Sequence, residues 1–150
     1  MPNPDQPKPK NSPNLILAFD FGLKWIGVAV GQTLTSSARP LTTLRATQGK
    51  VAEAELTTLV QEWAPDALVV GLPLNMDDSE SAMSTRSRRF ARYLEKSTKL
   101  PIHLVDERLT SYAADTTVFP ASRNLNQTTG PGNHAQAACL IAESYLSEYR

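Results

Sequence analysis

Apolar residues in this chain form short continuous runs, separated by segments in which they recur at helical spacing. Leu15–Phe19 and Ala67–Leu72 are almost entirely apolar, which is typical of strands buried on both faces of a sheet. Three further strands are predicted at residues 25–32, 39–44 and 100–105. Four segments have helical spacing or a helix N-cap: residues 48–63, 77–94, 109–118 and 134–149.

This order of elements predicts an α/β fold with a mixed five-stranded sheet and helices on both faces. Short links between the first three strands favour an antiparallel meander, and the later strands alternate with helices as βαβ crossovers. The strands ending at Asp20, Gly71 and Glu107 would then meet at one edge, where open α/β sheets place their sites. The prolines in residues 1–13 predict a disordered tail, so one domain is expected over residues 14–150.

Charge and cysteine content narrow the classes of protein. The 15 basic and 15 acidic residues cancel, so any contact with nucleic acid must come from a local basic patch. The single cysteine, Cys139, cannot form an internal disulfide, and no Cys/His spacing indicates zinc. No segment has the length of a membrane span or the apolar core of a signal peptide. We therefore expect a cytoplasmic protein that does not bind membranes.

The candidate catalytic and metal-binding residues are Asp20, Glu107 and His134. Asp20 and Glu107 each follow an apolar strand, and His134 begins the last predicted helix after a Gly-Pro-Gly loop. If the two carboxylates and the imidazole lie close together in the fold, they could hold Mg²⁺ or Mn²⁺. Two such ions could activate water and stabilise the leaving oxygen of a phosphodiester. The alternative is that these residues are structural. Asp20 would then be a capped residue in a hairpin, Asp106 or Glu107 would pair with Arg108, and His134 would merely start a helix.

The candidates for binding nucleic acid are basic or amide side chains near the same strand ends. Arginine matches phosphate geometry through two parallel hydrogen bonds, although a helix rich in arginine can equally be a solvated face. Asn75 follows the strand at 67–72 and would either contact substrate or cap the next helix. The candidates are Lys24, Asn75, Arg86, Arg89 and Arg108, with Arg88 and Arg92 on the same predicted helix.

Three linked motifs resemble those of the YqgF family. They are Phe19-Asp20-Phe21-Gly22 with Ile26-Gly27-Val28-Ala29, Val69–Asn75, and Asp106-Glu107-Arg108-Leu109-Thr110, and the resemblance covers nearly all of residues 14–150. It implies a ribonuclease H-like fold and a divalent-metal-dependent nuclease. The acidic triad of the family carries over to Asp20 and Glu107. Its third member is usually an Asp where this chain has His134, which shifts the expected metal preference toward Mn²⁺.

These expectations leave three functions open. The first is a two-metal endonuclease acting on structured RNA, with the 5′ end of pre-16S rRNA as the substrate that the resemblance implies. The second is Holliday junction DNA cleavage by the same site, which needs a dimer to cut two strands symmetrically. The third is a non-catalytic nucleic-acid-binding module in which His134 marks a decayed site. A monomer or a weak homodimer is expected. An actin-like ATPase, suggested by the Asp-x-Gly segment, needs a second lobe for which this chain is too short.

Overall fold

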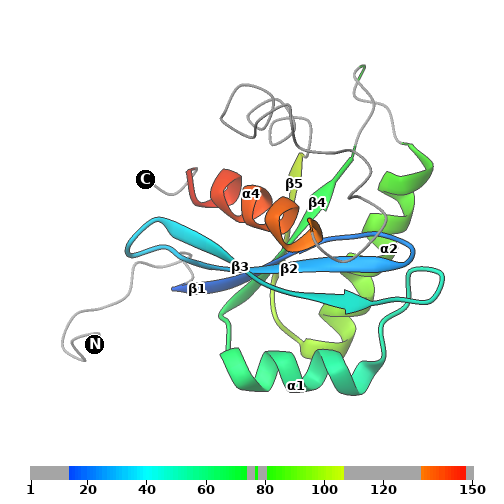
Figure 1. Cartoon of the computed structure of the whole chain (residues 1–150), viewed down its shortest axis with the longest axis horizontal. Helices are drawn as coiled ribbons and strands as arrows, with labels where there is room; N and C mark the ends of the chain where they lie inside the picture. Colours follow the sequence, from blue (N-terminus) through cyan, green and yellow to red (C-terminus); the bar gives the residue numbers. More distant parts are fainter. Residues whose placement is uncertain (1–13, 74–76, 78–80, 107–132, 148–150) are drawn as a thin grey trace.

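The computed structural model describes residues 14–73, 77, 81–106 and 133–147. In these residues a five-stranded sheet has the order β3-β2-β1-β4-β5, with α1 and α2 on one side and α4 on the other (Figure 1). The elements are β1 (Leu15–Asp20), β2 (Trp25–Gln32), β3 (Ser37–Arg45), α1 (Glu53–Trp63), β4 (Ala67–Leu72), α2 (Ala82–Thr98), β5 (Ile102–Asp106) and α4 (His134–Ser147).

β1 is the central strand and joins the two halves of the sheet. It pairs antiparallel with β2, and β2 pairs antiparallel with the edge strand β3, so the first three strands form the expected meander. β1 also pairs parallel with β4, and β4 pairs parallel with β5. The predicted mixed sheet is therefore confirmed. Because β1, β4 and β5 run in the same direction, their carboxyl ends lie at one edge.

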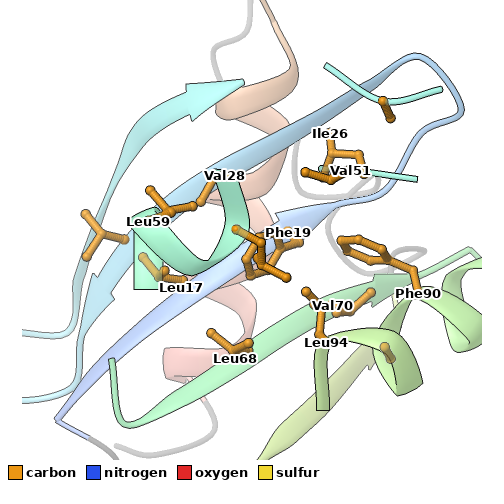
Figure 2. Packing of buried hydrophobic residues seen from close by; sticks show 14 residues of the cluster. Leu17, Phe19, Ile26, Val28, Val51, Leu59, Leu68, Val70, Phe90 and Leu94 are labelled. Carbon is orange, nitrogen blue, oxygen red and sulfur yellow. The ribbon is translucent and has the colours of Figure 1, made fainter. Parts of the chain in front are cut away.

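The side chains of β1 alternate between two hydrophobic clusters. Leu17 and Phe19 face α1 and α2, where Phe19 packs edge-on against Phe90 with ring centroids 5.8 Å apart (Figure 2). Ile16 and Ala18 face the other side and belong to the cluster that includes α4. All four β1 side chains are fully buried. The apolar run in β1 is therefore continuous because helices cover both faces of the strand.

The first helix, α1, begins at Glu53, later than its apolar spacing indicates. Gln48 and Gly49 have positive φ angles of 51° and 82°. Backbone hydrogen bonds in both directions close a turn between Thr47 and Lys50. Left-handed backbone angles are incompatible with a right-handed helix. The prediction that this helix starts at residue 48 is therefore wrong, because turn geometry takes precedence over apolar periodicity there.

The second helix, α2, also begins later than predicted, at Ala82 rather than at the acidic residues before it. Ser81 is its N-cap. The Oγ of Ser81 accepts a hydrogen bond from the Ser84 N–H at 2.9 Å, and the Oγ of Ser84 accepts one from the Ser81 N–H at 2.7 Å. This reciprocal capping box satisfies two N–H groups at the start of the helix, and two serines supply it in place of the expected acidic residues.

Smaller differences concern the ends of strands. β3 begins at Ser37 rather than at residue 39, and β5 spans Ile102–Asp106 rather than 100–105. Pro40 lies where the β2–β3 register shifts, as expected for proline in an edge strand. The predicted tail, the helix at 109–118 and the last residues of the helix at 134–149 lie outside the described residues. Within the described part of the chain, no helix is both long and apolar enough to span a membrane.

Cys139 provides a test of how α4 is buried. Its side chain is 8% exposed, and burial, followed by the negative charge of Glu143, raises the pKa of the thiol from 9.0 to about 11. Folding thus favours the neutral thiol. The stabilisation that this thiol contributes is fully present below pH 9 and is lost as the pH rises toward 11. We predict that the urea midpoint of the wild type falls over this range by more than that of Cys139→Ala. Parallel pH profiles for the two proteins would contradict this burial.

Candidate functional site

Asp20 ends β1 and continues the alternation of that strand. Ile16 and Ala18 face α4, so Asp20, two residues further on, projects from the same face of the sheet. In the antiparallel register Asp20 pairs with Gly27 of β2. The carboxylate therefore leaves the sheet on the α4 side, at the edge where the parallel strands end.

The first turn of α4 lies directly against β2 at Gly27. A Cβ at this position would collide with the backbone carbonyl of His134 and would lie 2.8 Å from the nitrogen of Ala135. Only glycine permits such a close approach of two backbones. Because Cβ positions of cross-strand partners lie about 4.5–5.5 Å apart, the side chain of Asp20 starts beside this turn. The backbone of His134 thus lies against the cross-strand partner of Asp20.

The imidazole of His134 lies near the indole ring of Trp25, which itself stacks under a guanidinium group. Its ring centroid lies 6.5 Å from that of Trp25, and the guanidinium carbon of Arg45 lies 5.6 Å from the Trp25 ring centroid. Nε2 of His134 is buried and has no hydrogen-bond partner among the described residues. A buried polar atom is costly when unsatisfied, so a cation or a water molecule bound at this nitrogen would remove that cost.

Asp106 lies at the same edge of the sheet but at the end of β5. It pairs with Leu72, the last residue of β4, in a parallel register, and β4 separates β5 from β1. Strands are about 4.8 Å apart, so Asp106 and Asp20 lie roughly 10 Å apart across the sheet. The predicted site residues Glu107, Arg108 and Asn75 lie outside the described residues.

Asp20 and His134 have the chemistry of two ligands in a divalent-cation site. Carboxylate oxygens suit Mg²⁺ and Mn²⁺, and imidazole favours the transition metal of the two. Among residues 14–73, 77, 81–106 and 133–147, no group of three or more His, Cys, Asp or Glu side chains could hold a metal ion. These two residues therefore fit a cation only as part of a set completed by other protein ligands, by water or by substrate oxygens.

A cavity opens beside Phe21, on the side of the sheet that faces α2. Its volume is about 450 Å³, and residues 48–51 and α2 line it. It shares Arg86 with an adjoining cavity of about 630 Å³ at the β1–β2 turn. We call the two together the basic cavity, because no described acidic residue lines them whereas five cations do: Lys24, Arg45, Lys50, Arg86 and Arg89.

The arginines of α2 divide between two faces of the helix. Arg86 and Arg89, three residues apart, lie on one face and line the basic cavity. Arg88 and Arg92, four residues apart, line a separate hollow beside β5. The helix is therefore not a uniformly solvated basic face, and only two of its four arginines lie near the end of β1.

Sequence reasoning missed Trp25, Arg45 and Lys50. Trp25 and Arg45 are cross-strand partners on β2 and β3, and a single sequence does not give the register that pairs them. Lys50 follows the Gln48-Gly49 turn. A glycine preceded by a polar residue is a turn signal, and it could have separated Lys50 from the predicted helix.

Sequence comparison finds close similarity over most of the chain. The sequence model of the RuvX family, described as Holliday junction resolvase, matches residues 14–148. A protein of Azotobacter vinelandii is 45% identical over 138 residues, which cover 92% of this chain and 96% of that protein. A protein of Pseudomonas putida is 54% identical over 100 residues, covering 67% of this chain and 71% of that one. Both are described as candidate pre-16S rRNA nucleases.

Comparison of folds finds Holliday junction resolvases. RuvC of Thermus thermophilus, in complex with a Holliday junction, has a TM-score of 0.56 at 14% identity and covers 90% of this chain and 94% of its own. The fowlpox virus Holliday junction resolvase has a TM-score of 0.53 at 12% identity, covering 91% of this chain and 99% of its own. At this level of identity the similarity establishes the fold, and it confirms the ribonuclease H-like architecture expected from the sequence.

The contact at Gly27 can be tested by adding one methyl group. We predict that Gly27→Ala lowers the free energy of unfolding by about 3 kcal/mol or more, the upper end of the range typical of overpacking. The loss is large because the new Cβ meets the backbone of α4 rather than a movable side chain. Gly31→Ala is the control: its Cβ would meet only side-chain carbons of Ile16 and Leu146 at 3.2 Å. Urea unfolding followed by circular dichroism measures both. Equal losses in the two variants would mean that α4 is not held at Gly27.

Proposed function

The chain belongs to the RuvX family, and from this premise we propose that it is a divalent-metal-dependent nuclease that cuts phosphodiester bonds in structured RNA. The observation that supports the proposal is the contact of the His134 backbone with Gly27, the cross-strand partner of Asp20, at the edge where β1 ends. The basic cavity begins at the β1–β2 turn that follows Asp20. The relatives are described as candidate pre-16S rRNA nucleases, and within that precursor we propose the 5′ end, which the resemblance of the sequence motifs implies, as the substrate. Action on a ribosomal precursor would place the protein in the cytoplasm.

Each site residue has a proposed task. Asp20 and His134 would hold two Mg²⁺ or Mn²⁺ ions, with Glu107 as a third ligand inferred from the sequence motif alone. When bound, such ions supply positive charge against the phosphate and lower the pKa of water. Lys24 and Arg86 line one cavity beside the β1–β2 turn, and they would bind phosphate oxygens there and orient the backbone. Arg108 and Asn75 remain proposed contacts to nucleic acid on sequence grounds.

Cleavage of branched DNA is a second candidate, favoured by the description of the matching family as Holliday junction resolvase. Symmetric cutting of a junction requires two copies of the site related by a two-fold axis. Light scattering and a cleavage assay on a four-way junction separate the two candidates. Paired cuts by a dimer would support the resolvase, whereas cutting of RNA by a monomer would support the ribonuclease.

The role of Asp20 can be tested by an isosteric change. We predict that Asp20→Asn lowers the rate of cleavage of a 5′-extended 16S rRNA precursor by more than about a hundredfold, because loss of a direct metal ligand should exceed the 10–100-fold effect of a second-shell partner. Glu62→Gln removes an exposed carboxylate from α1 and is the matched control. Cleavage that survives in Asp20→Asn, or that needs no divalent metal, would overturn the proposal.

The role of His134 can be tested by its metal preference. We predict that His134→Asp raises the ratio of Mg²⁺-supported to Mn²⁺-supported cleavage, because a hard oxygen ligand replaces an imidazole nitrogen. Gln136→Asp adds the same charge at an exposed position in the same turn of α4 and serves as control. The ratio should change in His134→Asp alone. An equal change in both variants would assign the effect to general electrostatics rather than to ligation.

A further inference from the structure

We propose that the part of the basic cavity next to Phe21 binds one unstacked base of a single-stranded RNA segment flanking the phosphodiester bond that is cut. The inference rests on the proposed nuclease function and adds to it the form of RNA that the site accepts. It is carried by three features: aromatic walls, a fixed turn that closes one side, and cations at the rim. Each feature involves residues outside the Asp20–His134 pair.

The aromatic walls come from Phe21, which directly follows β1, and from α2. The ring centroid of Phe21 lies 5.2 Å from that of Phe90, and Figure 2 shows Phe90 reaching from α2 toward Phe19 in the core. Tyr93 also lines the cavity, and its hydroxyl donates a hydrogen bond to the Val51 carbonyl oxygen at 3.3 Å. Phe90 is buried and supports the ring of Phe21 from the core, so the half-buried rings of Phe21 and Tyr93 are the ones that can face a ligand. Fixed aromatic faces are the surfaces on which RNA-binding proteins stack single bases.

The turn at residues 47–50 closes one side of the cavity. The N–H of Gly49 donates a hydrogen bond to the Leu23 carbonyl at 2.9 Å, so this turn is tied to the β1–β2 turn. Gly49 has a φ of 82°, and a Cβ there would lie 2.8 Å from the Phe21 ring. Glycine therefore allows the turn to lie against the aromatic wall. The cavity of about 450 Å³ is preformed, and its size is within the 300–1,000 Å³ range of sites for small organic groups.

The charges at the rim indicate an anionic ligand. Lys50, Arg86 and Arg89 line this cavity, and no described acidic residue does. Cations alone would suit any anion. Aromatic walls together with cations suit a nucleotide, because its base has a π face and its phosphate is charged. In a duplex the bases are paired and stacked, so only a single-stranded nucleotide can present its base to this cavity.

The position of the cavity relates it to the proposed cleavage site. Phe21 follows Asp20 directly and packs against the cluster on the α1–α2 side of the sheet. Asp20 continues the face of Ile16 and Ala18 on the α4 side, so the two side chains lie on opposite faces. An RNA strand that crosses this edge would place one base against Phe21 and a neighbouring phosphate on the Asp20 side. The cavity would therefore fix the register of the strand relative to the bond that is cut.

Binding of abasic oligonucleotides tests the proposal without cleavage. The full chain, in EDTA, is titrated with single-stranded RNAs that each lack one base at successive positions, and affinity is measured by fluorescence anisotropy. We expect the loss of one particular base to weaken binding about tenfold, the order of one stacked base, whereas the other positions change it little. A duplex of the same sequence should bind more weakly than the single strand. A uniform response to base removal, or equal binding of duplex, would overturn the proposal.

Two variants identify the cavity as the place of binding. In Tyr93→Leu, which removes an aromatic wall, we expect the position-specific loss to disappear. In Arg89→Gln, which removes only charge, we expect weaker binding and a salt dependence reduced by about 0.7 in logarithmic slope, and this variant tests the site even if Tyr93→Leu does not fold. Arg92→Gln is the matched control, because Arg92 is exposed on the other face of α2. Equal effects of Arg89→Gln and Arg92→Gln would overturn the assignment.

The results also separate this inference from the proposed nuclease function. A uniform abasic response with metal-dependent cleavage intact would overturn the base pocket alone. A position-specific response in a protein that cuts no RNA with either metal would support the pocket and overturn the nuclease.

Discussion

The close approach of α4 to β2 at Gly27 is the contact on which the candidate site depends. A helix normally stands off a sheet by the length of its side chains, but here the His134 carbonyl occupies the space that a Cβ would fill. This contact fixes the start of α4 beside the cross-strand partner of Asp20. The start of a helix also favours negative charge through its unpaired N–H groups and its dipole. A carboxylate and a phosphate can therefore gather at this edge at lower cost than elsewhere on the surface.

The end of β1 separates two kinds of chemistry. On the α4 side are Asp20, which continues the face of Ile16 and Ala18, and the imidazole of His134, whose Nε2 is buried. On the α2 side is the basic cavity, whose described lining includes cations and no carboxylate. Strand alternation sets the face of Asp20, because successive side chains point to opposite faces, and turns and α2 supply the cations of the other side. A phosphate held near the edge would meet positive charge from one side and potential cation ligands from the other. The zero net charge of the chain conceals this local segregation.

Sequence patterns predicted the sheet better than they predicted the starts of helices. The strands of the core were located correctly because both faces of β1 and β4 are covered, which leaves no polar residue inside the runs. The start of α1 was misplaced because Val51 fits helical spacing while it packs in the core ahead of the helix. The start of α2 was misplaced because acidic residues and a serine capping box are both helix-start signals, and only geometry chooses between them.

By itself the sequence determined the element order, the mixed sheet, the strand-end position of Asp20 and the family to which the chain belongs, because these depend on local pattern and on motifs contiguous in the chain. The tertiary structure decided which side chains share a face. It placed the His134 backbone against Gly27, the cross-strand partner of Asp20. It put Arg86 and Arg89 on one face of α2 and Arg88 and Arg92 on another. It also made Trp25 and Arg45 cross-strand neighbours. These relations depend on strand register and on the packing of distant helices, which are set by the summed burial of the whole core rather than by any local segment.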